Sequence, residues 1–186
     1  EALADLLKLA PLKVTAAKDD EVRQNTLLRT APTMPALDRY TGVLYGALDV
    51  PGMTPAERSR AKARVVVMSS LFGPVGGGDL VPAYRLSAGT ALPGLGTMAH
   101  YWKPLAAPLL AALREPVLDL RSGAYAAFGE VPGAITVRAV AEQPDGTRTV
   151  ISHFNKHAKG CLARIVATLR ADLDSVDDVI DVARAA

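Results

Sequence analysis

Hydrophobic and polar positions along the chain follow both helical and strand periods, which is typical of a mixed α/β fold. Short continuous apolar runs bounded by turn residues predict two buried central strands, at 65–71 and 117–120. Apolar and polar residues alternate on both sides of Pro144-Asp145-Gly146, which predicts a hairpin. Helical spacing dominates elsewhere. The pattern therefore predicts an α/β fold in which a mixed sheet is flanked by helices.

Several helices carry recognisable start signals. Leu3 and its neighbours indicate a helix within the first 30 residues. Thr54 and Glu57 flank Pro55 with the spacing of a capping box, so a helix is predicted to start there. Residues 97–113 predict a helix that is either broken at its prolines or starts at one of them. A last helix is predicted from Ser175, which forms a capping box with Asp178.

The stretch 152–169 combines an apolar helical stripe with a group of cations. Asn155 is predicted to cap this helix, which places Lys156, His157 and Lys159 at its N-terminus. Cations there oppose the helix dipole, whereas an anion is favoured. Two interpretations follow. In one, the cations are solvated side chains and Gly160 only marks close packing. In the other, backbone N–H groups and the two lysines form an anion site, and Gly160 lets a phosphate approach.

Composition fits a globular protein, with 49% hydrophobic residues and a net charge of +2. The last helix is acidic, so the rest of the chain is more basic than the total suggests, and this permits a polyanionic partner. The single cysteine, Cys161, excludes an internal disulfide, and three scattered histidines offer no zinc site. We therefore expect no metal, no cofactor and a cytoplasmic location, and no apolar stretch predicts a membrane span.

Two further segments favour structural interpretations. The glycine-rich loop 74–89 lacks the Gly-Lys-Ser/Thr end of a Walker loop and the order of a dinucleotide fold, so its glycines are interpreted as turn residues. The cations of the helix that starts at Thr54 are interpreted as a solvated helix face; they are Arg58, Arg60, Lys62 and Arg64.

Five motifs occur in an order that resembles one known family. They read "DRYTGVLYGAL", "SSLFGPVGGGDLVPAYRLSAG", "HYWKPL", "LDLRSGAYAAF" and "ISHFNKHAKGCLARIV". Together they resemble the YaaA family of bacterial peroxide-stress proteins across roughly residues 20–170. The resemblance implies a single-domain mixed α/β fold peculiar to that family, a positively charged cleft and DNA binding, with a helix-hairpin-helix-like element near the front.

The resemblance also implies which residues form the site. Candidates for binding a nucleic acid or another anion are Lys156, His157 and Lys159 of the family motif, together with Arg85 and Arg121, which each lie just beyond a strand or loop motif. Either arginine could instead form a structural ion pair, with Asp79 or Asp119. Candidates for the walls of the cleft are Tyr40, Tyr84, Ser122, Tyr125, Asn155 and Gly160. Residues 1–186 are expected to form one YaaA-like domain that lacks the family's N-terminal strand and loop.

The chain departs from the family pattern at three places. Gly76-Gly77 replaces an Arg-Pro pair, Ala124 replaces a glutamate, and His157 replaces a lysine. Each change removes a permanent charge, so chemistry that needs those charges is not expected here.

Three functions remain open from the sequence. The leading hypothesis is a DNA-binding protein of the peroxide-stress response that contacts phosphates of double-stranded or distorted DNA with little sequence readout. The alternative is an enzyme acting on a nucleotide, a damaged base or another phosphorylated ligand, using His157 or Ser122 with Tyr125 and Asp119. The third possibility is a role in interaction with a partner, which is suggested only by the acidic last helix.

Overall fold

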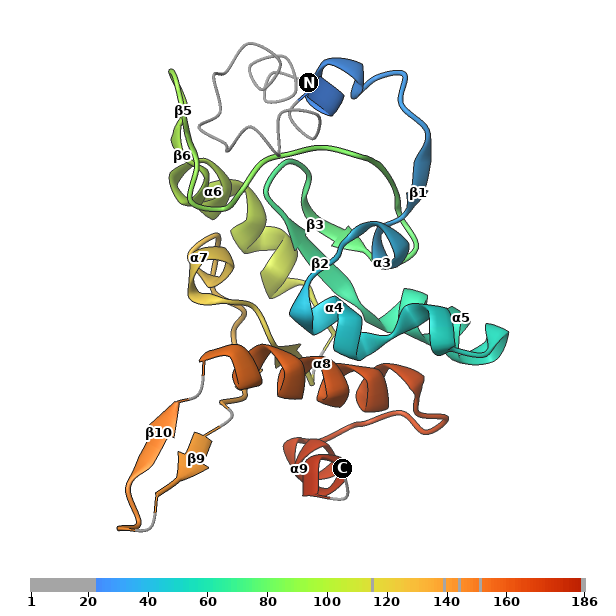
Figure 1. Ribbon diagram of the computed structural model, residues 1–186, viewed down its shortest axis with the longest axis vertical. Helices are drawn as coiled ribbons and strands as arrows, with labels where there is room; N and C mark the ends of the chain where they lie inside the picture. Colours follow the sequence, from blue (N-terminus) through green and yellow to red (C-terminus); the bar gives the residue numbers. More distant parts are fainter. Residues whose placement is uncertain (1–22, 115, 139, 144, 151, 185–186) are drawn as a thin grey trace. The chain divides into compact units, whose positions relative to one another are not determined.

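The computed structural model describes residues 23–114, 116–138, 140–143, 145–150 and 152–184 (Figure 1). The helix predicted around Leu3 lies outside these residues. Contacts divide the chain into two compact units, each built from three separate stretches. Unit 1 comprises the described residues of 1–39, 66–113 and 121–132, and unit 2 those of 40–65, 114–120 and 133–186. One domain over 1–186 stays a prediction.

The strands of unit 1 form two-stranded antiparallel ladders. The pairs are β2 (Val66–Ser69) with β3 (Gly73–Gly76), β1 (Thr33–Pro35) with β4 (Leu80–Pro82), and β5 (Ala91–Leu92) with β6 (Gly96–Thr97). The strand predicted at 65–71 is confirmed as β2, whose last three residues are buried. In the described chain β2 pairs only with β3, so its predicted central position is not found.

Gly73 begins β3 and lets an aromatic ring lie against the backbone. Its φ of 72° belongs to the left-handed region that glycine adopts without strain. A Cβ at this position would stand 2.6 Å from the Trp102 ring. The glycine therefore fixes the place of Trp102 beside the end of β2.

The helical segments in the described part of unit 1 are η2 (Gln24–Leu27), α3 (Ala36–Arg39), α6 (Met98–Ala111) and α7 (Gly123–Ala126). The break or helix start predicted at the prolines is wrong, because α6 begins at Met98 and runs through both Pro104 and Pro108. Proline in a helix removes a hydrogen bond. The fully buried Met98 and Ala106 lie on α6, and tertiary packing of this kind overrides the helical preference of single residues.

The glycine-rich loop after β3 closes on itself. The Asp79 carboxylate accepts a hydrogen bond from the Gly76 backbone N–H at 2.7 Å. The carbonyls of Gly77 and Asp79 accept from Leu37 and Ala36 of α3. The interpretation of these glycines as turn residues is thus confirmed.

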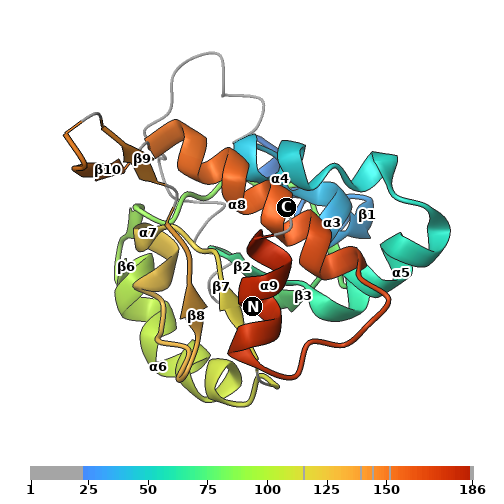
Figure 2. The same cartoon turned by 90° about the horizontal axis from the view of Figure 1, so that it is seen from below.

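Unit 2 is mainly helical. Its helices are α4 (Val43–Leu48), η3 (Val50–Gly52), α5 (Pro55–Arg64), α8 (Ser152–Thr168) and α9 (Val176–Arg184). Helix α8 packs against α4, α5 and α9, and the two views show α4 and α9 beside it (Figures 1 and 2).

The strands of unit 2 are short. β7 (Leu118–Asp119) pairs in parallel with β8 (Ile135–Thr136), and β9 (Val140–Glu142) pairs antiparallel with β10 (Arg148–Val150). The predicted hairpin is confirmed as β9 and β10. The strand predicted at 117–120 exists as β7, but it is half-buried and pairs only with β8 in the described chain, so its predicted central position is not found.

Helices and strands in both units confirm the mixed α/β class. The strands of the described chain pair as five two-stranded ladders, four antiparallel and one parallel, rather than as one large sheet. Among the described residues, no helix combines the length and apolar character that crossing a bilayer requires.

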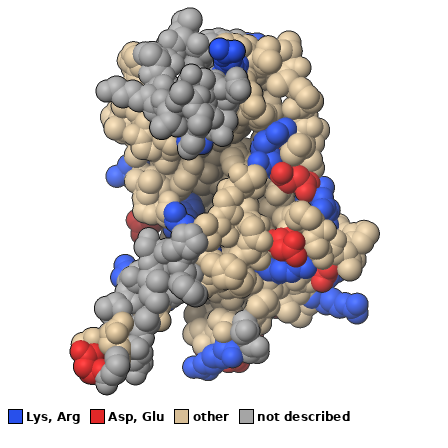
Figure 3. All heavy atoms as spheres, in the orientation of Figure 1, with Lys and Arg blue, Asp and Glu red and all other residues tan. Residues whose placement is uncertain are grey.

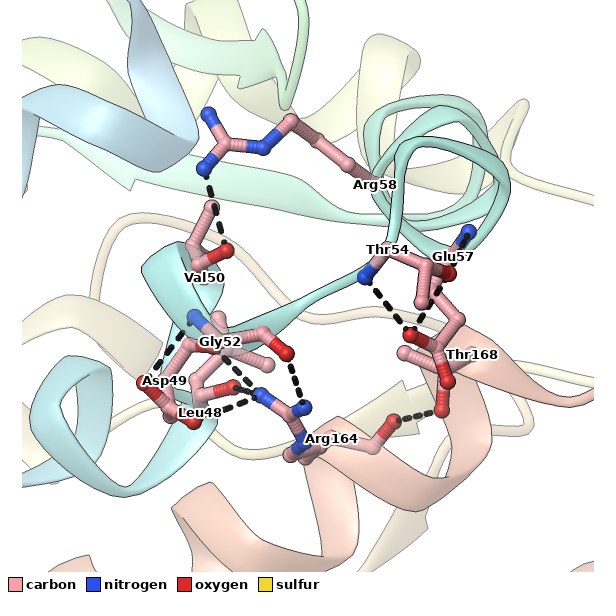
Figure 4. Close-up of polar contacts among 9 residues, drawn as sticks. All are labelled: Leu48, Asp49, Val50, Gly52, Thr54, Glu57, Arg58, Arg164 and Thr168. Atoms are coloured by element: carbon pink, nitrogen blue, oxygen red, sulfur yellow. Dashed lines mark hydrogen bonds and ion pairs between the residues drawn. The ribbon is translucent and has the colours of Figure 1, made fainter.

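The predicted capping box of α5 is confirmed. The Glu57 backbone N–H donates to Thr54 Oγ1 at 3.3 Å, and the Thr54 N–H donates to Glu57 Oε2 at 2.8 Å (Figure 4). These bonds from the backbone and hydroxyl of Thr54 lower the pKa of Glu57. The box predicted at Ser175 and Asp178 is confirmed too, with bonds of 3.1 and 2.9 Å.

The cations of α5 do not form the solvated face that the sequence predicted. Arg60 Nε donates to the Thr168 carbonyl at 2.9 Å, and Arg64 Nη1 donates to the Leu169 carbonyl at 2.7 Å. The last carbonyls of a helix lack intrahelical partners and carry partial negative charge, so guanidinium groups there satisfy both needs. Arg60 and Arg64 therefore bind α5 to the end of α8.

A third arginine connects α8 to the corner after α4. Asp49 occupies the left-handed region at φ 48°, and Arg164 reaches this corner from α8. Arg164 donates to the carbonyls of Leu48 and Gly52, each at 3.1 Å, and to the Asp49 carboxylate at 3.1 Å (Figure 4). One side chain thus holds the whole turn between α4 and η3.

We predict that Thr54→Ala lowers the free energy of unfolding by about 1 kcal/mol, because the N-terminal N–H groups of α5 lose their acceptor. Urea denaturation followed by circular dichroism measures this loss. Ser59→Ala is the matched control, since Ser59 is exposed within the same helix, and its effect should stay within about 0.5 kcal/mol. Equal effects of the two changes would contradict the structural role of the box.

Candidate functional site

Two consecutive serines at the end of β2 hold two of the predicted cleft tyrosines. Ser69 and Ser70 are fully buried. Ser69 Oγ lies 2.7 Å from Tyr84 Oη, and Ser70 Oγ donates to Tyr125 Oη at 3.3 Å. Trp102 Nε1 donates to the Ser70 carbonyl at 2.7 Å. We call Ser69, Ser70, Tyr84, Tyr125 and Trp102 the serine–tyrosine cluster.

The contacts of Ser69 fix the direction of one proton in this cluster. Its Oγ accepts from the backbone N–H groups of Leu71 at 3.2 Å and Phe72 at 3.0 Å. A hydroxyl oxygen has two lone pairs, so the Ser69 hydroxyl proton is directed to Tyr84.

The backbone of Arg85 is anchored by a residue that the sequence did not single out. Asn25 is 1% exposed, and its side chain donates to the Arg85 carbonyl at 2.9 Å and accepts from the Arg85 N–H at 2.7 Å. These two hydrogen bonds fix the position of the Arg85 backbone, and with it the start of the half-buried Arg85 side chain. Its role in binding an anion stays a prediction.

Arg121 has a structural task around α7. Its guanidinium donates to the Gly129 carbonyl at 2.9 Å and to the Tyr125 carbonyl at 3.4 Å. The exposed Ser122 precedes α7, and its carbonyl accepts from the N–H groups of Tyr125 and Ala126. Arg121 thus supports the helix that carries Tyr125. A phosphate contact by Arg121 stays a prediction.

The cations of α8 do not lie at the helix N-terminus. The helix begins at Ser152, so Asn155 is inside it and is not its cap, contrary to the prediction. The backbone N–H groups from Lys156 onward bond to carbonyls one turn earlier in an α-helix. They are therefore not available to a phosphate, so the backbone part of the predicted anion site is not found, and an anion contact by the lysine side chains stays a prediction.

Gly160 serves helix packing and not the approach of a phosphate. A Cβ at Gly160 would collide with the Leu44 carbonyl oxygen and would stand 2.6 Å from Ala47 Cβ. Both residues lie on α4. The alternative that the sequence left open, close packing, is confirmed.

The side chains of this stretch differ in exposure. Lys156 and His157 are exposed, whereas Lys159 is half-buried. Lys159 Nζ donates to the Leu120 carbonyl at 3.4 Å. Burial lowers the pKa of Lys159, the charge of Asp119 opposes this change, and the charge of Arg138 adds to it.

Tyr40, another predicted cleft residue, lies just before α4. Its ring stacks on that of Tyr45, with 5.9 Å between ring centroids. This contact fixes the segment that leads into α4.

The predicted site residues are distributed over both units. Unit 1 contains Tyr84, Arg85, Arg121, Ser122 and Tyr125, and unit 2 contains Tyr40, Asn155, Lys156, His157, Lys159 and Gly160. Within unit 1 the structure places Tyr84 and Tyr125 on adjacent serines. A common cleft for all these residues stays a prediction.

Sequence reasoning missed Ser69, Ser70 and Asn25. The two serines directly follow a buried apolar run, and sites in α/β proteins gather where strands end, so a signal existed for them. Asn25 had no such signal, because its partner, Arg85, is 60 residues away.

Unit 2 also contains an open pocket of about 650 Å³ between α5 and α8. Its polar lining includes Glu57, Arg60 and Arg164. Each of these side chains already serves a cap or a backbone carbonyl. The pocket is therefore a product of helix packing. In the described part of the chain, no three His, Cys, Asp or Glu side chains gather closely enough to hold a metal ion.

The structure defines a mixed α/β protein that carries the serine–tyrosine cluster, in which the two serines are buried, and a helix with exposed cations. The chain belongs to the family described as peroxide stress protein YaaA, which it matches over residues 2–185. The resemblance found in the sequence is thereby confirmed.

Relatives occur in several bacteria. A UPF0246 protein of Corynebacterium efficiens is 46% identical over 194 residues, which cover 99% of this chain and 78% of the relative. A UPF0246 protein of Corynebacterium glutamicum is 42% identical with the same coverage. One of Streptomyces coelicolor is 45% identical over 160 residues, which cover 81% of this chain and 58% of the relative.

We predict that Ser69→Ala lowers the free energy of unfolding by about 1–3 kcal/mol, because it leaves buried N–H groups and a phenol without their partner. Tyr84→Phe removes one hydroxyl and should cost only about 0.5–1.5 kcal/mol. Urea denaturation of both variants provides the comparison. A larger loss for Tyr84→Phe would show that Ser69 is not the centre of the network.

We predict that Gly160→Ala destabilises the protein by about 1–3 kcal/mol, because α8 must move away from α4 to admit the methyl group. Gly46→Ala is the matched control, since a Cβ there would meet nothing within 4 Å. That change should instead stabilise by about 0.5–1 kcal/mol, because alanine favours a helix. Thermal denaturation of both variants tests this, and equal shifts in melting temperature would contradict the close contact.

Proposed function

We propose that the chain is a cytoplasmic DNA-binding protein of the peroxide-stress response, which binds phosphates through cationic side chains and reads little sequence. The observation that supports this proposal is the exposure of Lys156 and His157 on α8, with Lys159 one turn away. Residues three apart on a helix lie about 5–6 Å from each other, so Lys156 and Lys159 can reach neighbouring phosphates.

The packing of α8 supports a binding role because it fixes the cations in position. Gly160 presses the helix against α4, and Arg164 fastens it one turn further on. Side chains on a helix held in this way lose little backbone entropy on binding, which favours affinity. The family name, peroxide stress protein, gives the cellular context.

The charge distribution favours local phosphate contacts over a long basic stripe. On the face drawn in Figure 3, Lys and Arg side chains lie in separate groups, and several of these adjoin Asp or Glu. Phosphate contacts position a protein on DNA without carrying base information. We therefore expect similar affinity for unrelated duplex sequences.

The salt dependence of binding tests the proposal. In a fluorescence-anisotropy titration with labelled duplex DNA, Lys156→Ala should reduce the slope of log K against log salt by about 0.9. Lys156→Ala combined with Lys159→Ala should reduce it by about 1.8, because each lysine neutralises one phosphate. Affinity should fall equally for different sequences.

Arg184→Ala is the control for a general loss of charge. Arg184 is 76% exposed on the acidic helix α9, where it pairs with Asp181 at 3.4 Å. Its removal should leave the slope unchanged. An unchanged slope in the folded double variant, or no binding by the wild-type chain at low salt, would overturn the proposal.

A further inference from the structure

The open pocket between α5 and α8 takes no part in the proposed binding of DNA. Its volume of about 650 Å³ lies within the range of small-molecule sites. Helix packing forms the pocket, and every residue that lines it belongs to unit 2. Space for a small ligand therefore exists at the place where the two helices are held together.

Part of the lining is apolar. Ala47 of α4, Ile165 of α8 and Leu169 just beyond α8 contribute to it. All three are half-buried, so they keep surface that the carbon part of a ligand can cover. Cys161, Ile165 and Thr168 recur every three or four residues along α8 and therefore share the face that lines the pocket.

Three arginines and one glutamate give the pocket its charge. They are Arg60, Arg164, Arg170 and Glu57, so the charged side chains of the lining carry a net charge of +2. Glu57 stays ionised at neutral pH, because hydrogen bonds from Thr54 lower the pKa of its carboxyl group. The ligand that balances this charge is a dianion.

Two of the arginines keep donors that helix packing does not use. The half-buried Arg60 donates from Nε to the Thr168 carbonyl, whereas neither terminal nitrogen of its guanidinium has a protein partner within the described ranges. Arg170 is exposed and makes no polar contact with the same part of the chain. Arg164, by contrast, uses both terminal nitrogens on the turn after α4 (Figure 4). Arg60 and Arg170 are thus the side chains of the pocket that can bind an anion.

We propose that this pocket binds a small organic phosphate, whose phosphate group contacts Arg60 and Arg170 and whose carbon part lies against Ile165 and Leu169. A phosphate monoester carries a charge of about −1.5 to −2 at pH 7, which matches the net charge of the lining. Guanidinium groups bind phosphate through two parallel hydrogen bonds. The proposal does not depend on DNA binding, because it uses none of the cations assigned to DNA.

Cys161 provides a direct measure of occupancy. It lines the pocket, it is exposed, and it is the single cysteine of the chain. Phenyl phosphate is the probe, since it combines a phosphate group with an apolar ring. We expect it to slow the alkylation of Cys161 by iodoacetamide, a neutral reagent, as its concentration rises. Mass spectrometry of the full chain measures the alkylation rate, and isothermal titration calorimetry measures the affinity.

Two further probes separate the parts of the ligand. Inorganic phosphate has no carbon part, and benzoate carries the ring with a single negative charge. Each should bind about tenfold more weakly than phenyl phosphate, because it lacks either the apolar contact or the second charge. Benzoate that binds as tightly as phenyl phosphate would overturn phosphate as the ligand class.

Variants of the two arginines test which side chains hold the phosphate. Arg170→Ala should weaken the binding of phenyl phosphate about tenfold, because it removes charge-assisted hydrogen bonds. Arg60→Lys keeps a cation and loses the planar pair of donors, so binding should weaken by about the same factor. Arg114→Ala is the matched control, since Arg114 is an exposed arginine of unit 2 outside the lining. It should retain the wild-type affinity.

Two outcomes would overturn the pocket as a phosphate site. One is the absence of protection of Cys161 by phenyl phosphate in the wild-type chain, a readout that depends on no variant. The other is an equal loss of affinity in Arg114→Ala and Arg170→Ala, because general charge would then explain the binding. Neither outcome bears on the salt slope of DNA binding, so the two proposals fail or stand separately.

Discussion

The close contact between α8 and α4 is the constraint on which the candidate cations of unit 2 depend. Gly160 meets the Leu44 carbonyl oxygen with no room for a side chain, so α8 can rotate very little against α4. Lys156, Gly160 and Arg164 are spaced by one turn and share one side of α8. Gly160 and Arg164 are held on α4 and its corner, whereas Lys156 is exposed. A single glycine thereby sets the direction in which the cation is presented.

Arginine contacts with backbone carbonyls are a second recurrent feature of both units. Arg60 and Arg64 satisfy the last carbonyls of α8, Arg164 holds the turn after α4, and Arg121 holds carbonyls around α7. A guanidinium suits this task because its five donors have a fixed geometry and it stays charged. Much of the basic charge counted from the sequence therefore stabilises the fold. The number of basic residues counted from the sequence therefore overstates how many cations a polyanion could contact.

Local sequence signals predicted local structure well. The capping boxes at Thr54 and Ser175, the hairpin around Gly146 and the strand β2 were all predicted, because each depends on residues a few positions apart. The start of α8 was misplaced at Asn155, since a good capping residue also fits inside a helix when the chain before it is already helical.

Contacts between distant residues could not be predicted in the same way. The bonds from Arg60 and Arg64 to α8 span more than 100 residues, and the bond between Ser70 and Tyr125 spans 55. Family motifs had nevertheless marked Tyr84 and Tyr125, which the structure places on adjacent serines. The motifs thus identified members of a network whose centre, Ser69 and Ser70, only the structure reveals.

The two lysines of α8 show why position along a helix does not determine chemistry. Lys156 and Lys159 are three residues apart and have the same side chain, yet only Lys159 is half-buried beside Asp119 and Arg138. A solvated ammonium keeps its proton and acts as a point charge, whereas burial makes the neutral amine easier to form. Two lysines within one turn of the same helix therefore have different surroundings.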